Sequence, residues 1–428
     1  MASKLAILGG KPAVPPGVKF LVWPRISKQD EKYVLASLRQ DSHAWGPNCT
    51  ALQAEFARWN GNKFCAATNS GTAALHMALA ACDICAGDEV ITTALSWTSS
   101  GTCMLHHNAI PIFVDVEWET MLLAPSRIEA AVTRKTRAIM PVHYWGVPCD
   151  MAAIMKIACK HNLHVIEDCC QAHGATFKDR KVGTMGHCNA FSLNQNKNFC
   201  GGEGGLLVTD DEAMYVKARA LMSFGEMRAP EASRDFHSYG MGWMYRTNDL
   251  SAAFARSQLT GLDRTNALAR ENFDRMQDGL KGLPDVVLPF DTRTQRSNAY
   301  AYVVRVAPKA AERRGCELSL LRDATKEALR AEGVPVASAR WMLPAHTVFQ
   351  AKNGYGHGCP WRCGNARKGI SYDLKQYPVT TRVVDSCIQV SINGHRPPNG
   401  ARQINAIIKG VRKVFENLDQ VPLEAARP

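Results

Sequence analysis

Two polar residues that follow strand-like apolar stretches are the first sign of chemistry in this sequence. The run Val165-Ile166-Glu167-Asp168 is an apolar strand that ends in acids, and residues 190–193 form a second strand that leads into a loop with Lys197. In open α/β sheets, ligands bind beyond the carboxyl ends of the strands. We therefore expect Asp168 and Lys197, which are 29 residues apart, to face one ligand as an acid and an amine.

An amine and a carboxylate at two strand ends suit pyridoxal 5′-phosphate (PLP). This cofactor needs an amine to form a Schiff base and an anion to keep its pyridine nitrogen protonated, because the pyridinium withdraws electrons from the substrate. An opposite charge within about 4–6 Å favours the protonated form of a base. Asp168 would supply that anion. Lys197 would supply the amine and then act as the base that moves a proton between substrate and cofactor.

The phosphate of such a cofactor needs a site of its own, and Ser70-Gly71-Thr72 at the start of an Ala-rich helical stretch can provide one. Free N–H groups and the positive end of the helix dipole attract anions, and glycine permits a close approach. Ser192, five residues before Lys197, is placed to help. Each motif alone is also common at surfaces or helix caps, so the prediction depends on their order and spacing.

The elements that must position these residues alternate between strands and helices. Apolar periodicity predicts helices at 29–38, 50–59, 73–81 and 150–160, and strands at 63–68, 89–92, 110–114, 138–142, 164–167 and 190–193. This alternation is typical of an α/β fold with a mainly parallel sheet covered by helices on both faces. A strand at 206–209 follows the one at 190–193 too closely for a crossover helix, so we expect that pair to be antiparallel.

The chain is long enough for two domains, because single cores stop growing near about 250–300 residues. We expect a large PLP-binding α/β domain with an N-terminal arm over residues 1–280, and a smaller α+β domain over residues 281–428. A helical stretch from Leu250 to about Leu280 is expected to bridge the two. The smaller domain is expected to hold a strand at 299–306, a helix at 319–332 capped by Ser319, an irregular stretch at 353–364 and an amphipathic helix at 404–415.

Composition and charge bear on the compartment and the kinds of partner. Hydrophobic residues make up 46% and charged residues 21%, which excludes wholesale disorder. The formal charge of +12 is spread along the chain without a basic run interleaved with aromatics, so we expect no nucleic-acid partner. No apolar run approaches the roughly 20 residues that a membrane helix needs. Fifteen cysteines in a chain of this length predict reduced thiols and a cytoplasmic location.

Over nearly its whole length the sequence resembles the DegT/DnrJ/EryC1/StrS family of PLP-dependent sugar and aminocyclitol aminotransferases, which have the fold type I of PLP enzymes. The segments that carry the resemblance are Ser70–Leu75, Gly87–Ile91, Ser96–Ser99, Pro141–His143, Ile166–Gly174, Val182–Thr184, Phe191–Lys197, Gly202–Gly205 and Tyr245–Leu250.

The resemblance implies a role for each candidate residue. Lys197 would be the Schiff-base lysine and Asp168 the partner of the pyridinium. Asn248 would reach the phosphate bound to the neighbouring protomer, which makes a homodimer with shared active sites the smallest active unit. The other cofactor contacts would come from Trp97 on the ring, Gln171 near the ring and its phenolic oxygen, and Ser70, Gly71, Thr72 and Ser192 at the phosphate.

The implied reaction transfers an amino group from glutamine or glutamate to a keto sugar, keto-cyclitol or similar polar ketone, as in the biosynthesis of amino sugars and antibiotics. Two alternatives stay open. One is a different PLP-dependent reaction on the same scaffold, such as elimination or ring formation, and the other is a PLP-binding sensor without catalysis. The acceptor stays open because the segment Gly356–Cys363 is not part of the pattern that the family's sugar-transforming members share.

Cysteine and histidine motifs elsewhere have competing interpretations. Cys359, Cys363 and His357 could ligate zinc, but the CxxxC spacing and the lack of a second pair favour loop thiols, and we assign no metal. Cys82-Asp83-Ile84-Cys85 ends a helix instead of beginning one, so helix-end packing is expected there. His143 could face the cofactor or fill the layer at a strand end.

Three arginines of the smaller domain are candidates for a clamp on the donor carboxylate, because the guanidinium fork matches a carboxylate. They are Arg340, Arg382 and Arg396, and none is preferred over the others. A dinucleotide fold is excluded, since no G-x-G-x-x-G lies between a first strand and its helix.

Overall fold

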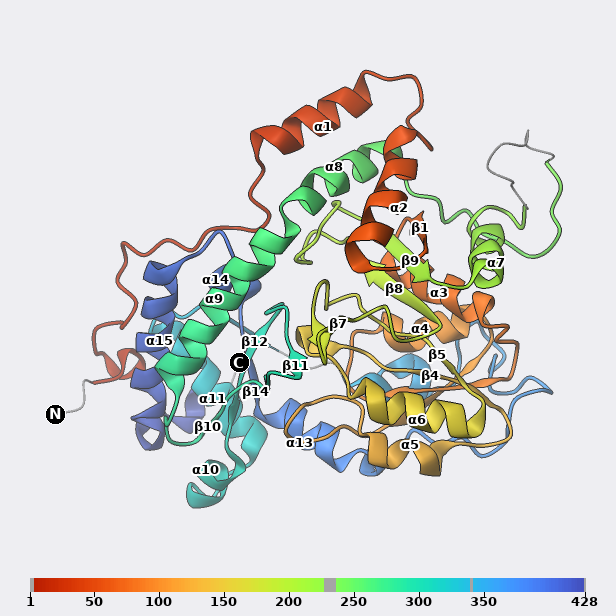
Figure 1. Cartoon of the computed structure of the whole chain (residues 1–428). Helices are drawn as coiled ribbons and strands as arrows, with labels where there is room; N and C mark the ends of the chain where they lie inside the picture. The colour runs from red at the N-terminus through yellow and green to blue at the C-terminus, as the bar shows by residue number, and fades with distance from the viewer. Residues whose placement is uncertain (1–3, 227–235, 339–341, 427–428) are drawn as a thin grey trace.

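The computed structural model describes residues 4–226, 236–338 and 342–426 (Figure 1). Its large sheet has the strand order β3-β2-β4-β5-β8-β9-β1, with single-residue bridges at Asp168 joining the β4 and β5 side to β8. All neighbouring strands are parallel except β9, which is antiparallel to both β8 and β1. The strands are β1 Phe64–Thr68, β2 Glu89–Thr93, β3 Ile110–Val114, β4 Thr136–Met140, β5 His164–Val165, β8 Cys188–Ser192 and β9 Gly205–Thr209.

Helices cover this sheet, as the sequence predicts, and the antiparallel arrangement of β8 and β9 is confirmed. Hydroxyl, carboxylate or amide side chains cap several of them, including Ser70 at α3 and Asp150 at α6. The helices of this part are α1 Lys28–Leu38, α2 Pro47–Asn60, α3 Gly71–Ala81, α4 Ser99–His106, α5 Pro125–Ala131, α6 Met151–His161, α7 Glu212–Met222, α8 Asp249–Thr260 and α9 Leu262–Leu280.

A second, antiparallel sheet of order β10-β12-β14-β13 is formed by the last third of the chain. Its strands are β10 Val286–Val287, β12 Tyr302–Val306, β13 Val336–Ser338 and β14 Cys387–Val390, and its helices are α10 Pro308–Arg313, α11 Leu318–Ala331, α13 Pro378–Ser386, α14 Ile392–His395 and α15 Ala401–Phe415. A small sheet joins β6 Thr176–Phe177, β7 Arg180–Lys181 and β11 Gln295–Arg296, and α12 spans Thr347–Gln350. Short 3-10 helices lie at Ala6–Leu8, Tyr144–Gly146, Leu343–Ala345, Leu374–Gln376, Leu418–Gln420 and Leu423–Ala426.

Helices α8 and α9 connect two hydrophobic cores. The buried residues of α8 pack with Phe56 and Phe191 of the large sheet region, whereas Phe273 and Met276 of α9 pack with the apolar stripe of α15. Figure 1 shows α9 running toward α15 and α14. The bridge expected between Leu250 and Leu280 is therefore present, while the division of the chain into domains at residue 280 stays a prediction.

Two sequence-based expectations about the last third are wrong. Helix α11 begins at Leu318 after Glu317, and Ser319 lies inside it and does not cap it. The irregular stretch at 353–364 does not pack with the smaller core: Trp361 donates to Tyr372 Oη (2.9 Å), and Tyr372 donates to the carbonyl of Pro111 in β3 (2.8 Å). Aromatic contacts between distant segments decided this placement, and sequence periodicity does not report them.

The N-terminal arm is anchored to the smaller core before it reaches the large sheet. The buried carboxylate of Glu332 accepts the backbone N–H groups of Ala6 and Ala13 (both 2.7 Å) and pairs with Lys413. Farther along, the Asn399 side chain exchanges two hydrogen bonds with the backbone of Leu21 (2.8 and 3.0 Å). No helix in the described part of the chain is both long and apolar enough to cross a membrane.

A buried polar network fixes the carboxyl ends of β4 and β5. Glu167 accepts a hydrogen bond from His143 Nε2 (2.9 Å) and from the backbone N–H groups of Gly183, Met185 and Gly186 (2.6–2.8 Å). His143 Nδ1 accepts the N–H of Cys149 (3.0 Å), so the neutral ring carries its proton on Nε2. Burial raises the pKa of Glu167, but these donors outweigh burial and hold the pKa below its ordinary value of 4.5.

This depressed pKa predicts how stability depends on pH. A carboxyl whose folded pKa lies below the unfolded one stabilises the fold above pH 4.5, and this contribution is lost as the pH falls. We expect Glu167→Gln to lower the free energy of unfolding at pH 7 by about 1–3 kcal/mol, since it takes a charged acceptor away from buried N–H donors. The difference from wild type should shrink below pH 4.5, as measured by urea unfolding at pH 7 and pH 4.

The matched control is Glu129→Gln, which changes an exposed glutamate paired with Lys160 and His161 at the surface. It should leave stability nearly unchanged at both pH values. An equal loss in the Glu167 and Glu129 variants, or a gap that does not change with pH, would contradict the network's role.

Candidate active site

A cavity of about 460 Å³ lies at the carboxyl ends of β4, β5 and β8, with β13 and β14 contributing its far wall. This volume is typical of a small-molecule site. The cavity brings together all the expected cofactor contacts of this chain except Asn248. They are Ser70, Gly71, Thr72, Trp97, Asp168, Gln171, Ser192 and Lys197.

Asp168 is held in one orientation at the floor of the cavity. Its Oδ2 accepts from Ser100 Oγ (2.7 Å), and its Oδ1 accepts the N–H of Cys170 (3.1 Å). Ser96 Oγ in turn lies 2.7 Å from Ser100 Oγ, which extends this network to the loop after β2. Asp168 is only 4% exposed, so its carboxylate faces the cavity with little contact with bulk solvent.

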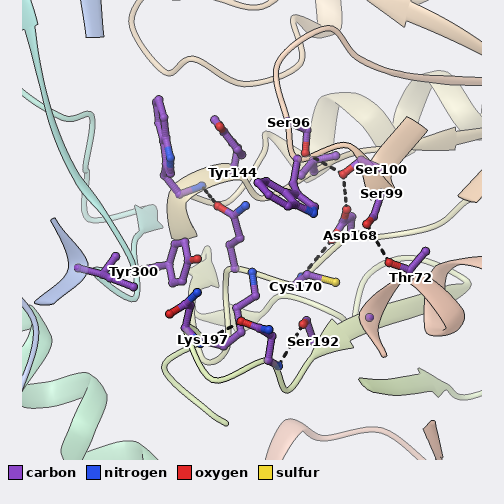
Figure 2. A pocket seen from close by; sticks show the side chains of 18 of the residues that line it. Thr72, Ser96, Ser99, Ser100, Tyr144, Asp168, Cys170, Ser192, Lys197 and Tyr300 are labelled. Carbon is purple, nitrogen blue, oxygen red and sulfur yellow. Dashed lines mark hydrogen bonds between the residues drawn. The ribbon is translucent and has the colours of Figure 1, made fainter. Parts of the chain in front are cut away.

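Lys197 reaches into the cavity from the loop after β8. Figure 2 shows its amine with Tyr300 on one side and with Asp168 and Thr72 on the other. The Nζ atom lies 5.1 Å from the centre of the Tyr300 ring. Gln171 lines the same cavity, and its Oε1 accepts the N–H of Trp145 (2.8 Å), which fixes the orientation of the amide. The acid and the amine that the sequence predicts therefore face one space.

The N-terminus of α3 forms the end of the cavity that suits an anion. Ser70 caps the helix, with its Oγ accepting from Ala73 N–H (3.0 Å), and Thr72 Oγ1 lies 2.8 Å from Ser99 Oγ. A Cβ at Gly71 would lie 2.7 Å from Ser192 Cβ, so only glycine lets the helix end come this close to β8. Free N–H groups and hydroxyls at this point suit a phosphate.

These observations together test whether PLP fits the residues present. One cavity contains a primary amine, a carboxylate and a hydroxyl-rich helix N-terminus that depends on Gly71. Trp97 lines the cavity with half of its surface exposed, and such a ring can stack on a heterocycle. PLP requires this set of groups, and the residues fit it.

The structure places other candidate residues away from the cavity. Asn248 is exposed and caps α8, where its side chain accepts from Ser251 N–H (2.9 Å). His143 belongs to the buried network under the strand ends and does not line the cavity, so the second interpretation of this residue holds. Arg382 is exposed over the Trp118 ring, and Arg340 lies outside the described residues.

The cysteine motifs show no catalytic arrangement in the described residues. Cys82 is buried at the end of α3, as expected for helix-end packing. Cys359 and Cys363 have their sulfur atoms 3.0 Å apart, but His357 does not join them in a three-ligand cluster. The three-ligand cluster that the described residues do contain is His143, Glu167 and Cys169, and hydrogen bonds already occupy that glutamate.

Several residues of the cavity carry no sequence signal strong enough to find them. Tyr300 and Gln389 come from segments more than 100 residues after Lys197. Cys170 also lines the cavity, and burial raises the pKa of its thiol well above the usual range. Ser100 is the exception, because Ser96 and Ser100 are four residues apart at a helix start beyond a strand, a pattern that could have indicated a hydroxyl relay.

Comparisons with known proteins identify the family of the chain. The model of the DegT/DnrJ/EryC1/StrS aminotransferase family matches residues 24–357. The spore coat polysaccharide biosynthesis protein SpsC of Bacillus subtilis is 35% identical over 78% of this chain and 85% of its own length. A Streptoalloteichus tenebrarius protein, provisionally named L-glutamine:3-amino-2,3-dideoxy-scyllo-inosose aminotransferase, is 34% identical over 98% of this chain and 99% of its own.

Among solved structures, 3-amino-5-hydroxybenzoic acid synthase superposes with a TM-score of 0.81, at 26% identity, over 93% of this chain and 99% of its own. The family match covers well over half of the sequence, including every candidate residue of the cavity up to Tyr300. The chain therefore belongs to the DegT/DnrJ/EryC1/StrS aminotransferase family, whose members are PLP-dependent enzymes.

Proposed function

We propose that this aminotransferase transfers the amino group of glutamine or glutamate to a keto-cyclitol or keto sugar, with Lys197 and Asp168 as its catalytic residues. One observation carries the proposal: a lysine amine and a fixed carboxylate line the same cavity as the N-terminus of α3. The relative that spans nearly the whole chain is named for a glutamine donor and a cyclitol acceptor, which supports this pair of substrates. SpsC is named for the biosynthesis of a polysaccharide, which supports a sugar as the other acceptor class.

Some residues of the cavity would hold the cofactor, and others would hold or transfer protons. When bound, PLP supplies an electron sink for the carbon that carries the amino group. Asp168 holds a proton at the pyridine nitrogen, and its bonds from Ser100 and Cys170 keep the carboxylate oriented for this. Lys197 Nζ holds the cofactor and then moves a proton at the amino-bearing carbon of the substrate. Ser70, Gly71, Thr72 and Ser192 hold the phosphate.

The far wall of the cavity offers neutral polar groups to an acceptor. Tyr300 and Gln389 are both more than 90% buried and line the cavity, and in the described residues their side-chain polar atoms have no hydrogen-bond partner. Polar atoms that face a cavity in this way can form hydrogen bonds with a bound ligand. Hydroxyl groups of a cyclitol or sugar ring are suitable partners, because they both donate and accept.

We also propose that the active unit is a homodimer. The segment before Asn248 exposes Phe236, Tyr239, Met241 and Met244, each by more than half of its surface. Apolar groups gathered on one exposed segment are typical of protein interfaces. We propose that a second copy buries this segment and that Asn248, which lies at the end of it, contacts the partner's cofactor phosphate, the role that the family resemblance implies. All fifteen cysteines are unpaired, which supports a cytoplasmic location for the dimer.

The roles of the two central residues can be tested by the half-reaction with glutamine alone. Wild type with PLP should release about one equivalent of keto acid per site, which a lyase or a sensor would not do. Lys197→Ala should lose at least about 10²-fold of this rate, and Asp168→Asn a comparable amount, because the first removes the proton carrier and the second the charge. The control is Lys178→Ala, an exposed lysine. Keto acid release by Lys197→Ala at the control's rate would refute the proposal.

The acceptor wall can be tested with Tyr300→Phe, which removes only the hydroxyl. If this hydroxyl bonds the ketone substrate, kcat/KM for the ketone should fall by about 3–10-fold, the value of one neutral hydrogen bond. Keto acid release from glutamine should change less. Tyr302→Phe is the control, since Tyr302 is buried outside the cavity and bonds Gln277. Equal effects on both half-reactions would show that the hydroxyl does not recognise the acceptor.

The shared site can be tested by subunit mixing. Lys197→Ala and Asn248→Ala chains should each be impaired alone, but a mixed dimer contains one complete site. After unfolding and refolding together in equal amounts, about a quarter of the sites should be complete. Activity should therefore return on mixing, measured against each refolded variant. No recovery, in samples shown to contain mixed dimers, would argue against an Asn248 that serves the partner.

A further inference from the structure

The loop that carries Lys197 accepts hydrogen bonds from two segments that are distant in sequence, one containing Trp23 and the other Arg396. Trp23 Nε1 donates to the carbonyl of Lys197 itself (2.9 Å). On either side of the lysine, Arg396 Nη2 donates to Asn196 O (2.8 Å) and Arg396 Nη1 to Asn198 Oδ1 (2.6 Å). Three consecutive residues are thus held by one indole and one guanidinium.

Arg396 buries its positive charge without a carboxylate partner among the described residues. The side chain is 2% exposed, and the ion pairs found in the described residues do not include it. Burial lowers the pKa of Arg396 to about 10, so the group is still charged at neutral pH. Its guanidinium lies 5.5 Å from the centre of the Trp23 ring and 5.2 Å from that of Tyr300, which compensate the charge in part.

The segments that contain Trp23 and Arg396 are also hydrogen-bonded to each other. Asn399 Nδ2 donates to Arg396 O (3.1 Å) and to Leu21 O (3.0 Å), and Trp23 N–H donates to Asn393 Oδ1 (3.2 Å). The N-terminal arm, the segment after β14 and the lysine loop therefore form one hydrogen-bonded unit. Both Nη groups of Arg396 donate to this loop, and Arg396 does not line the cavity. It is therefore not placed to bind a donor carboxylate.

We propose that Arg396 and Trp23 are positioning residues that set where the Lys197 amine lies in the cavity. The inference rests on the proposed role of Lys197. The amine lies 5.1 Å from the ring of Tyr300, the ring that also packs on Arg396, so a shift of the loop moves the amine relative to both Tyr300 and Asp168. A misplacement of about 1 Å can cost about 10²-fold in rate. A positive charge alone at position 396 is not sufficient, because the guanidinium fork must reach two acceptors at once.

The test compares two mild variants with two matched controls. Trp23→Phe removes the indole donor, and Arg396→Lys keeps the charge but loses the fork. The control Trp361→Phe also removes a buried indole bond, that to Tyr372 (2.9 Å). The control Arg305→Lys changes an arginine that is just as buried (1% exposed) but does not contact the lysine loop. Arg305 donates to the carbonyls of Trp118 and Glu119 and lies over the Trp118 ring.

The first measurement is backbone hydrogen exchange in cofactor-free protein over residues 194–201. The amides of Gln195, Lys197 and Gly201 bond within this loop and its neighbour and report its opening. Each hydrogen bond lost should speed their exchange by about fivefold, with a larger effect for Arg396→Lys than for Trp23→Phe. The controls should leave this peptide unchanged. The second measurement is the glutamine half-reaction, where kcat should fall by about 10²-fold for Arg396→Lys with little change in KM.

The outcomes separate this inference from the function on which it rests. If Lys197→Ala is inactive but Trp23→Phe and Arg396→Lys match their controls in exchange and in kcat, the positioning role is refuted and the function stands. If exchange rises equally along the whole chain, Arg396 is only a general stabiliser, which also refutes it. A Lys197→Ala protein that keeps its activity refutes the proposed function itself.

Discussion

The site depends on one stretch of backbone pairing. At Asp168 the chain bridges to Val142 on one side and to Ala190 on the other, so this residue joins the β4 and β5 side of the large sheet to β8. The paired backbone cannot shift without breaking hydrogen bonds on both sides. As a result, the Asp168 carboxylate has a fixed position relative to the strand end from which the Lys197 loop begins.

Alternation along an extended chain assigns opposite tasks to two adjacent acids. Successive side chains of extended backbone point to opposite faces, so Glu167 and Asp168 cannot enter the same space. Glu167 lies in the buried network with His143, on the opposite side of the strand ends from the cavity. Asp168 lines the cavity and takes its hydrogen bonds from Ser100 and Cys170. The first acid thereby stabilises the scaffold on which the second can act.

The lysine, by contrast, lies on a loop, and its position is determined by contacts from far along the chain. Trp23, Tyr300 and Arg396 surround it, and each comes from a segment more than 100 residues away in sequence. The N-terminal arm can reach Lys197 because Glu332 and Asn399 fix it to the smaller core on the way. The smaller core thus supports the site from outside the sheet that carries most of the site residues.

Local chemistry made part of this predictable from the sequence alone. Three features can be recognised from a few neighbouring residues each: the strand that ends at Asp168, the strand that leads to Lys197, and the helix start at Ser70-Gly71-Thr72. The structure brings all three into one cavity. The placement of Tyr300, Gln389, Arg396 and residues 353–364 had no such signal. Their contacts form only when segments far apart in the chain pack together, and no local periodicity encodes which distant surface a side chain will meet. The chemical groups and the strand ends that present them can thus be identified from local sequence, whereas long-range packing sets what surrounds and orients the amine.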